Sequence, residues 1–470
     1  MLWRMRMLRW MGALRVWMCP VFVAGVVALG ACRAPAPMEP PLEAVALPER
    51  FAGTGGGAGS GAAAKAEREW WRAFASPELD GLVTEALRAN HGLGAARERV
   101  VQADAVMRQA RAALIPTLDF GLQAEETRRR RGGAGAGAWR WETSYEADLW
   151  GRLRSARDAA ALDREATVFD AQALELSVAA AVATAWVRWV SQEAQIDLLK
   201  NQRATNLQGL ELLRLRNRRG QASAADVAQQ EQLVESLNGE IELAEGRLEV
   251  FANALAVWCG RIPGTMGRPA KSVLPSPGPL PQTGVPGDWV VRRPDLQRAL
   301  ARVAAADKRL AVAVADQFPR VSVAGSLGES RSDWSGLFDD WALRLGANLA
   351  APVVDGGRRR AEVERQEAVR REAVRSFANE VIEALAEVED ALVLDRRQER
   401  HLRSLEEQER LAAFALERAR AGYLAGDETY LRVLDAVRSS QNLQRNVVAA
   451  RQQWLELRVA LFLALAGSLS

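Results

Sequence analysis

The 470-residue sequence has few of the side chains that enzymes most often use for chemistry. Its only two histidines, His91 and His401, lie far apart in the chain, which leaves little room for a metal centre or a catalytic triad. No phosphate-binding loop with a Gly-Lys-Ser/Thr ending is present. The charge is nearly balanced, with 62 basic and 59 acidic residues and a net charge of +3, so a nucleic-acid partner is not indicated. An enzyme is therefore the least favoured class, and neither a metal nor a diffusible cofactor is expected.

Cysteine is equally scarce, with three in the whole chain. A basic region and the short apolar run "VFVAGVVALGAC" precede Cys32, which is typical of an export signal rather than of a membrane-spanning helix. The segment Leu29-Gly30-Ala31-Cys32 resembles a bacterial lipobox, in which the cysteine is lipidated and becomes the first residue. We expect residues 1–31 to be a lipoprotein signal peptide and Cys32 to carry a lipid anchor. Arg33 stands where an aspartate would indicate inner-membrane retention, so resemblance to known lipoproteins favours the outer membrane.

Proline is absent from two long stretches, between Pro116 and Pro263 and after Pro352. In contrast, residues 261–288 hold seven prolines together with Gly and Ser, which is the composition of a linker. Residues 32–69, rich in Pro, Gly and Ala, are expected to form a flexible, lipid-anchored tether. The chain is therefore divided into a first structural repeat over 70–260 and a second over 289–470.

The two halves repeat like features at a constant distance. Gly151 and Gly357 belong to the similar segments "DLWGRLRSA" and "VDGGRRRAE" and are 357 − 151 = 206 residues apart. Gly220 and Gly426, each expected where a long helix reverses, are separated by 426 − 220 = 206 residues as well. A constant offset indicates an internal duplication, so both halves should share one architecture.

Each half contains one pair of strands with an apolar and a polar face. In residues 139–149, aromatic and apolar side chains alternate strictly with Arg, Glu, Ser and Asp. The same alternation predicts β-hairpins over 117–149, with the Arg/Gly segment 127–138 as a loop, and over 320–351. Strands of this length with aromatic residues are typical of a membrane β-barrel. The expected membrane-interface aromatics are Trp139, Trp141, Trp150 and Trp341.

Four strands cannot close a barrel, and an open sheet edge cannot lie in lipid because its backbone groups would be unpaired. The chain is therefore expected to oligomerise. Three copies would supply twelve strands, an even number that leaves a lumen.

The proline-free stretches predict helices far longer than a compact domain needs. Apolar or small residues recur at spacings of three and four along 153–219 and again along the second half, which is a coiled-coil seam. A helix of about 67 residues would be about 100 Å long. Shorter helices over 78–115 and 223–260 would stack end to end beside the first long helix.

These elements, in this order, resemble the TolC-like outer membrane efflux factors, especially their lipoprotein branch. The resemblance covers nearly the whole mature chain and is carried by several segments in the family's order, including "WWRAFASPELDGLVTEALRAN", "YEADLWGRLRSARDAA", "APVVDGGRRRAEV" and "GYLAGDETYLRVLDAVRSS". It implies an α+β membrane fold, in which a trimeric 12-stranded transmembrane β-barrel is continued by a long periplasmic α-helical barrel.

The resemblance also implies a function. The chain would be the outer membrane channel of a tripartite efflux system, passively exporting drugs or other small toxic compounds. Its partners would be a periplasmic adaptor protein and an inner-membrane pump, with the resistance-nodulation-division type favoured. A duct for type I protein secretion is an alternative, and a periplasmic adaptor or a structural coiled-coil tether is less favoured because neither needs polar-lined strands.

A wide duct would leak, so the periplasmic end should close at rest. The hairpin tips, marked by Arg218, Arg219, Gly220 and Gly426, are the candidate places. By resemblance, a tyrosine before the second tip glycine and an aspartate in "LDA" constrict the pore. The candidate gate residues are Tyr423, Asp427, Glu428, Arg432 and Asp435. The first tip departs from the family, since Arg218 and Arg219 stand where an aromatic residue is common.

Overall fold

In the computed structural model, residues 69–129, 132–271, 273–276, 278, 280, 292–331 and 339–465 are described. The predicted signal peptide, the lipidation site Cys32 and nearly all of the tether lie outside these residues. So does part of the linker between the two repeats.

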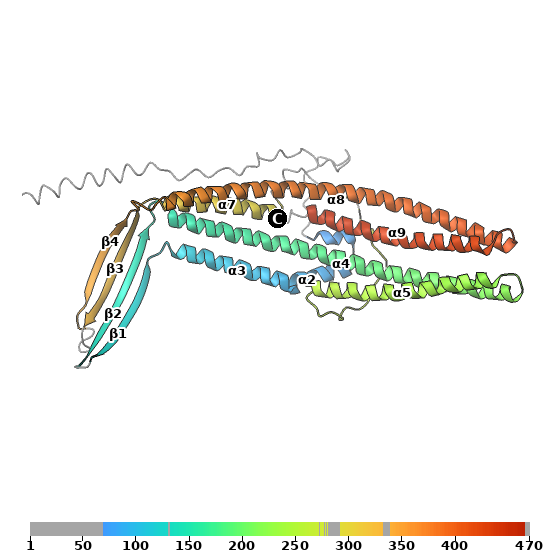
Figure 1. Cartoon of the computed structure of the whole chain (residues 1–470), viewed down its shortest axis with the longest axis horizontal. Helices are drawn as coiled ribbons and strands as arrows, with labels where there is room; N and C mark the ends of the chain where they lie inside the picture. The colour runs from blue at the N-terminus through green and yellow to red at the C-terminus, as the bar shows by residue number, and fades with distance from the viewer. Residues whose placement is uncertain are drawn as a thin grey trace, which may run out of the picture. The chain divides into compact units, whose positions relative to one another are not determined.

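The described chain contains two long helices, several shorter helices and one sheet (Figure 1). A short 3-10 helix, η4 (Trp70–Phe74), opens the described region. The elements that follow are α2 (Pro77–Ala89), α3 (His91–Ala112), β1 (Thr117–Arg129), β2 (Gly132–Ala147), α4 (Arg152–Arg218), α5 (Ala224–Trp258), α7 (Pro294–Ala315), β3 (Arg320–Arg331), β4 (Ala342–Ala350), α8 (Arg358–Ala425) and α9 (Tyr430–Leu465). Two structural units result. One contains the sheet and comprises Ala105–Leu162 and Val303–Val374. The described part of the other comprises 69–104, 163–302 and 375–465.

The four strands form one antiparallel sheet in the order β1-β2-β3-β4. Its register places the predicted apolar residues of all four strands on one face, as in the row in which Phe120 pairs with Trp141, Trp141 with Leu327 and Leu327 with Leu343. The strands β1, β2 and β3 are longer than the sequence predicted. The segment 127–138, expected as a loop, mostly continues β1 and β2, because its glycines pair with β1 in register.

Each long helix begins with an aspartate whose carboxylate accepts hydrogen bonds from backbone N–H groups at the start of the helix. The Asp148 carboxylate accepts hydrogen bonds from the backbone N–H groups of Leu153 and Arg154 at 3.0 and 2.9 Å. In the second half, the Asp355 carboxylate accepts from the N–H groups of Gly357 and Arg359 at 3.1 and 3.3 Å. A carboxylate at this position satisfies donors that have no partner in the first turn of a helix. The repeated sequence motif therefore sets the starting points of α4 and α8.

The predicted coiled-coil seams are the buried faces of α4 and α8. In α8, Phe377, Val381, Ala384, Val388 and Ala391 are all buried. Within the described residues α4 alone contains a segment apolar enough to cross a membrane, but 61% of that segment is buried inside the protein. The segment is thus part of the helical core.

One expected helix is interrupted. The sequence predicts a single helix over 78–115, whereas α2 ends at Ala89 and α3 starts at His91. Asn90 has an extended backbone, with ψ 119°. Its side-chain amide accepts from the Leu93 N–H at 3.1 Å and donates to the Trp258 carbonyl at 3.0 Å. Because the second partner lies 168 residues away in sequence, this break depends on tertiary structure.

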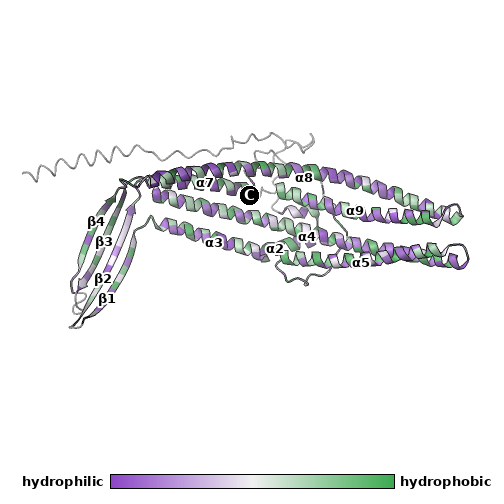
Figure 2. Ribbon diagram, viewed as in Figure 1, coloured by the Kyte–Doolittle hydropathy of each residue, from purple (hydrophilic) through white to green (hydrophobic). Residues whose placement is uncertain are grey.

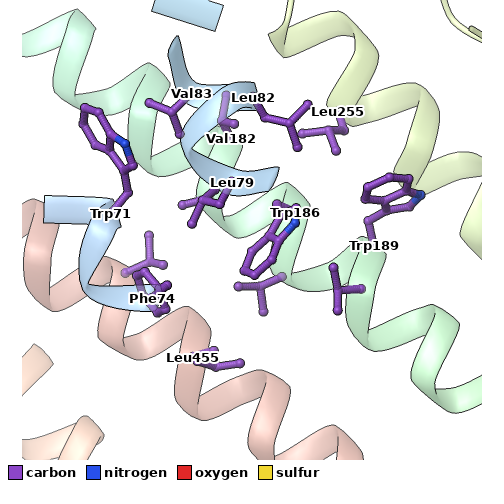
Figure 3. Close-up of a cluster of buried hydrophobic side chains, with 14 of the residues drawn as sticks. Trp71, Phe74, Leu79, Leu82, Val83, Val182, Trp186, Trp189, Leu255 and Leu455 are labelled. Carbon is purple, nitrogen blue, oxygen red and sulfur yellow. The ribbon is translucent and has the colours of Figure 1, made fainter. Parts of the chain in front are cut away.

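The main core forms where η4, α2, α4, α5 and α9 meet (Figure 3). Phe74, Leu79 and Leu255 are essentially inaccessible to solvent, and Trp186 is 3% exposed. The Trp186 indole N–H donates to the Glu78 carboxylate at 3.0 Å, so the polar atom of this ring is satisfied. Burial of several large aromatic side chains in this cluster contributes strongly to hydrophobic stabilisation.

A buried ion pair joins α8 to α9. The Arg458 guanidinium donates to both carboxylate oxygens of Asp395 at 2.8 and 3.0 Å, and the two residues are 2% and 0% exposed. Arg458 also donates to the Gly278 carbonyl at 3.0 Å. The pair therefore fixes part of the inter-repeat linker against the two helices, and removal of either partner would leave a buried charge uncompensated.

Candidate channel surface and hairpin tips

Hydrophobic and hydrophilic residues both occur along the strands of the sheet (Figure 2), and the apolar side chains on one of its faces are widely exposed. Leu118, Leu122 and Leu345 are 67%, 62% and 77% exposed. Phe120 and Trp141 pack across β1 and β2 with ring centroids 4.9 Å apart. A continuous apolar sheet face of this kind requires an apolar surrounding, and lipid provides it.

The opposite face is polar along all four strands. One row joins Asp119, Glu142, Ser326 and Arg344 by successive pairing. A second row joins Glu146, Ser322 and Asn348. Such a face is suited to line a water-filled lumen.

The four predicted interface aromatics occupy different environments. Trp139 and Trp141 lie in the middle of β2 rather than at its ends, and Trp341 directly precedes β4 and is 63% exposed. Trp150 stacks on Phe318 with ring centroids 4.9 Å apart, and the Trp150 indole N–H donates to the Pro319 carbonyl at 2.7 Å. Trp150 therefore ties the end of β2 to the start of β3, and the role of the four residues at a membrane interface stays a prediction.

The first tip is a short turn between α4 and α5. Gly220 has φ +73°, a left-handed conformation that favours glycine. Ser223 then caps α5 in a capping box with Asp226, with reciprocal hydrogen bonds of 3.1 and 3.0 Å. Arg218 and Arg219 are exposed and make no ion pair within the described part of the chain.

The second tip connects α8 to α9 in the same way. Gly426 has φ +88°, and the Asp427 N–H donates back to the Gly422 carbonyl at 2.9 Å. Of the candidate gate residues, Asp427, Glu428, Arg432 and Asp435 are all exposed. Glu428 and Arg432 form an ion pair of 3.6 Å on the helix surface, a geometry that contributes little in water.

Tyr423 is the candidate gate residue that contacts the other hairpin. The Arg216 guanidinium lies over its ring, 4.5 Å from the centroid. Tyr430 packs edge-on against the same ring at 5.5 Å. The Tyr430 hydroxyl donates to the Gln230 side-chain oxygen at 2.6 Å, and burial raises the pKa of Tyr430 to about 12. We call Arg216, Gln230, Tyr423 and Tyr430 the tip clasp.

The clasp borders a cavity of about 320 Å³ between the two hairpins. The Tyr423 hydroxyl is buried and has no hydrogen-bond partner among the described residues, so the contacts that hold the side chain are made by its ring. The structure thus brings Tyr423 to the clasp, while the exposed acidic residues stay outside it. The sequence reasoning did not single out Arg216 or Gln230. The run "RLRNRRG" indicated guanidinium groups at this tip but not which of them meets a ring.

The chain matches known proteins over most of its length. The family model for outer membrane efflux proteins matches residues 82–261 and 285–467. The chain belongs to this family, whose members are channels of the bacterial outer membrane.

Individual relatives agree with this assignment. The chain is 32% identical over 458 residues to the pyoverdine export outer membrane protein OpmQ of Pseudomonas putida strain KT2440, covering 94% of this chain and 95% of the relative. It is 30% identical over 463 residues to the outer membrane protein OprJ of Pseudomonas aeruginosa, covering 93% of each.

Among solved structures, the outer-membrane channel OprN matches with a TM-score of 0.83 at 22% identity, over 92% of this chain and 98% of OprN. The outer membrane protein VceC of Vibrio cholerae matches with a TM-score of 0.78 at 25% identity, over 85% of this chain and 98% of VceC. The predicted fold class is confirmed: the protein has the α+β fold of the trimeric outer membrane efflux channels, with four strands and a long helical region per chain. The predicted function as an outer membrane efflux component is confirmed as well.

Proposed function

We propose that three copies of this chain form a passive exit duct. The observation that carries the proposal is the sheet, with one apolar face, one polar face and two unpaired edges. In the order β1-β2-β3-β4, the strands β1 and β4 are each paired on one side only within the described part of the chain. Pairing β4 of one copy with β1 of the next satisfies the backbone groups that lipid cannot. Three sheets close a twelve-stranded barrel with the polar faces inside.

The mass of the detergent-solubilised particle tests this assembly. The protein portion should have three times the mass of one mature chain. Ion conductance in planar bilayers should accompany the trimeric fraction. A monomeric or dimeric particle, or a trimer without conductance, contradicts the proposal.

The proposed duct receives its cargo from a periplasmic adaptor and an inner-membrane pump of the resistance-nodulation-division type. Relatives named for pyoverdine export and for toluene efflux support a small-molecule cargo. Crosslinking in cells, followed by affinity capture and identification of the bound proteins, tests the partners. Capture of an ATP-driven pump instead would favour the alternative role in type I protein secretion.

The proposed closure lies at the tips. The clasp holds the two hairpins of one protomer together through Arg216, Tyr423, Tyr430 and Gln230. In a trimer the second tips would bring three copies of Asp435 towards one another, and such a ring repels itself unless it is paired. Opening would require the hairpins to separate, and adaptor binding to the separated state would supply the free energy.

The proposed anchor is a lipid on Cys32 in the outer membrane. It is supported by the lipobox-like sequence and by the family, whose members reside in that membrane. Intact-mass measurement of the mature protein tests it, since a lipidated N-terminal Cys32 has a distinct mass.

A further inference from the structure

The polar face of the sheet contains a hollow of about 440 Å³. It lies near the strand ends that are farthest along the chain from the helices, where β3 ends at Arg331 and β4 begins at Ala342. Its lining includes two guanidinium groups and two hydroxyl groups on this face, from Arg140, Arg344, Ser326 and Ser330. From these residues we infer that the hollow is a binding subsite for the carboxylate group of a small organic cargo.

Small residues keep the hollow open. Gly328 of β3 pairs with Arg140 of β2 and with Ala342 of β4. The strand β3, which lies between the strands that bear the two arginines, therefore has no side chain at position 328. A Cβ atom at Gly328 would lie 2.3 Å from the Trp139 carbonyl oxygen and 2.9 Å from the Arg140 Cα atom. Both neighbours are backbone atoms, which cannot move aside cheaply. Glycine is thus required at position 328, and because it has no side chain, its backbone forms the floor of the hollow.

The guanidinium of Arg344 is available to a ligand. Arg344 is exposed and makes no ion pair or side-chain hydrogen bond within the described residues. Arg140 is held by Glu142 at 2.8 Å, on the same strand and the same face. An arginine that is positioned by one carboxylate can still donate from its other N–H groups. The two guanidiniums and the hydroxyls are the donors that carboxylate oxygens prefer.

Two acidic residues also border the hollow. The Glu329 carboxylate pairs with Arg331 and accepts from the Asp340 backbone N–H at 3.3 Å, so its charge is compensated. Asp340 is exposed at the rim and repels a carboxylate ligand. Removal of the Asp340 charge should therefore strengthen carboxylate binding, whereas removal of the Arg344 charge should weaken it.

The inference rests on the proposed function, because the polar face becomes the wall of a lumen only in the closed barrel. Each trimer would then carry three such subsites, one from each chain. A carboxylate-bearing cargo would meet fixed positive groups there on its way through the lumen. Multiple weak sites of this kind favour entry without blocking departure.

Calorimetric titration of the full-length trimer in detergent with citrate tests the subsite. Arg344→Gln removes one charge-assisted interaction with the carboxylate. Because the side chain is exposed, we expect the Kd for citrate to rise by about five- to tenfold. Asp340→Asn should lower the Kd by a few-fold, since it removes a like charge. The matched control is Arg320→Gln, which removes an arginine from the same face of β3 at its other end and should leave the Kd unchanged.

Absence of citrate binding in the parent protein, or equal Kd values in all variants, overturns the subsite. Conductance of the same preparation in planar bilayers separates this result from a failure of the proposed function. A conducting trimer that does not bind citrate leaves the channel standing and removes the subsite. Citrate binding that follows the expected order of the variants, in a protein that does not conduct, supports the subsite and contradicts the channel.

Discussion

The contact between Arg216 and Tyr423 allows its contribution to the free energy of the proposed closed state to be estimated. Arg216→Gln removes the positive charge over the ring and keeps much of the side-chain length. A cation over an aromatic ring contributes about 0.5–1 kcal/mol at exposed sites and about 2 kcal/mol when desolvated. Both side chains are half-buried, so the expected loss is about 1 kcal/mol per protomer.

Three protomers that open together would lose about 3 kcal/mol of closing free energy. Because each 1.4 kcal/mol corresponds to a factor of ten, the ratio of closed to open channels should fall on the order of a hundredfold. Protomers that open independently would show a change of only about fivefold each. Open probability of single trimers in planar bilayers, recorded without an adaptor, measures this ratio directly.

Arg218→Gln is the matched control for this experiment. It makes the same charge change two positions later in the same tip, at an exposed side chain with no ion pair among the described residues. Its open probability should equal that of the parent. Equal opening by both variants would attribute the effect to the total charge of the tip, and an unchanged open probability in Arg216→Gln would refute the clasp as part of the closure.

Three further predictions concern the anchor, the buried ion pair and the gate. Cys32→Ala should block lipidation and signal removal, and an intact mass identical to that of the parent would contradict the anchor. Arg458→Met should destabilise the protein by about 3–5 kcal/mol, because it leaves Asp395 buried and unpaired; adding Asp395→Leu should recover most of the loss, as measured by the temperature at which trimers dissociate in gels. Tyr423→Ala combined with Asp435→Asn should raise single-channel conductance and sensitise cells to large antibiotics, whereas a folded double variant that conducts like the parent places the closure elsewhere.

Patterns that repeat along the chain predicted the architecture. Alternation of apolar and polar residues predicted the two faces of the sheet, because successive side chains on a strand point to opposite sides. The offset of 206 residues between Gly151 and Gly357 predicted that both halves begin a long helix after a hairpin. The structure shows the physical reason, since Asp148 and Asp355 cap those helices.

Features that depend on partners distant in sequence were not predictable in this way. Asn90 is a residue type that favours helix N-caps, and it caps α3 by accepting from the Leu93 N–H, but asparagine also occurs inside helices, so it did not by itself predict the break. Its hydrogen bond to the Trp258 carbonyl, which no local pattern indicates, adds a second interaction that holds the break. Similarly, the glycines of 132–137 read locally as a loop, and their pairing with β1 extends the sheet instead. The tip clasp combines residues from both halves of the chain, and no local pattern specifies that meeting.

The two unpaired edges of the sheet also constrain how the protein reaches its membrane. In the proposed assembly, each chain would cross the periplasm with both edges open and the apolar face uncovered, before β1 and β4 pair with other copies. Exposed edges and apolar strands are templates for aggregation. Folding chaperones would therefore be needed to shield the sheet until it enters the bilayer, and we expect insertion to be coupled to association of the chains. A copy that retains β1 but lacks β4 could pair with an intact chain through β1 and leave the barrel open. Such truncations should therefore be dominant-negative in cells that produce both the truncated and the intact chain.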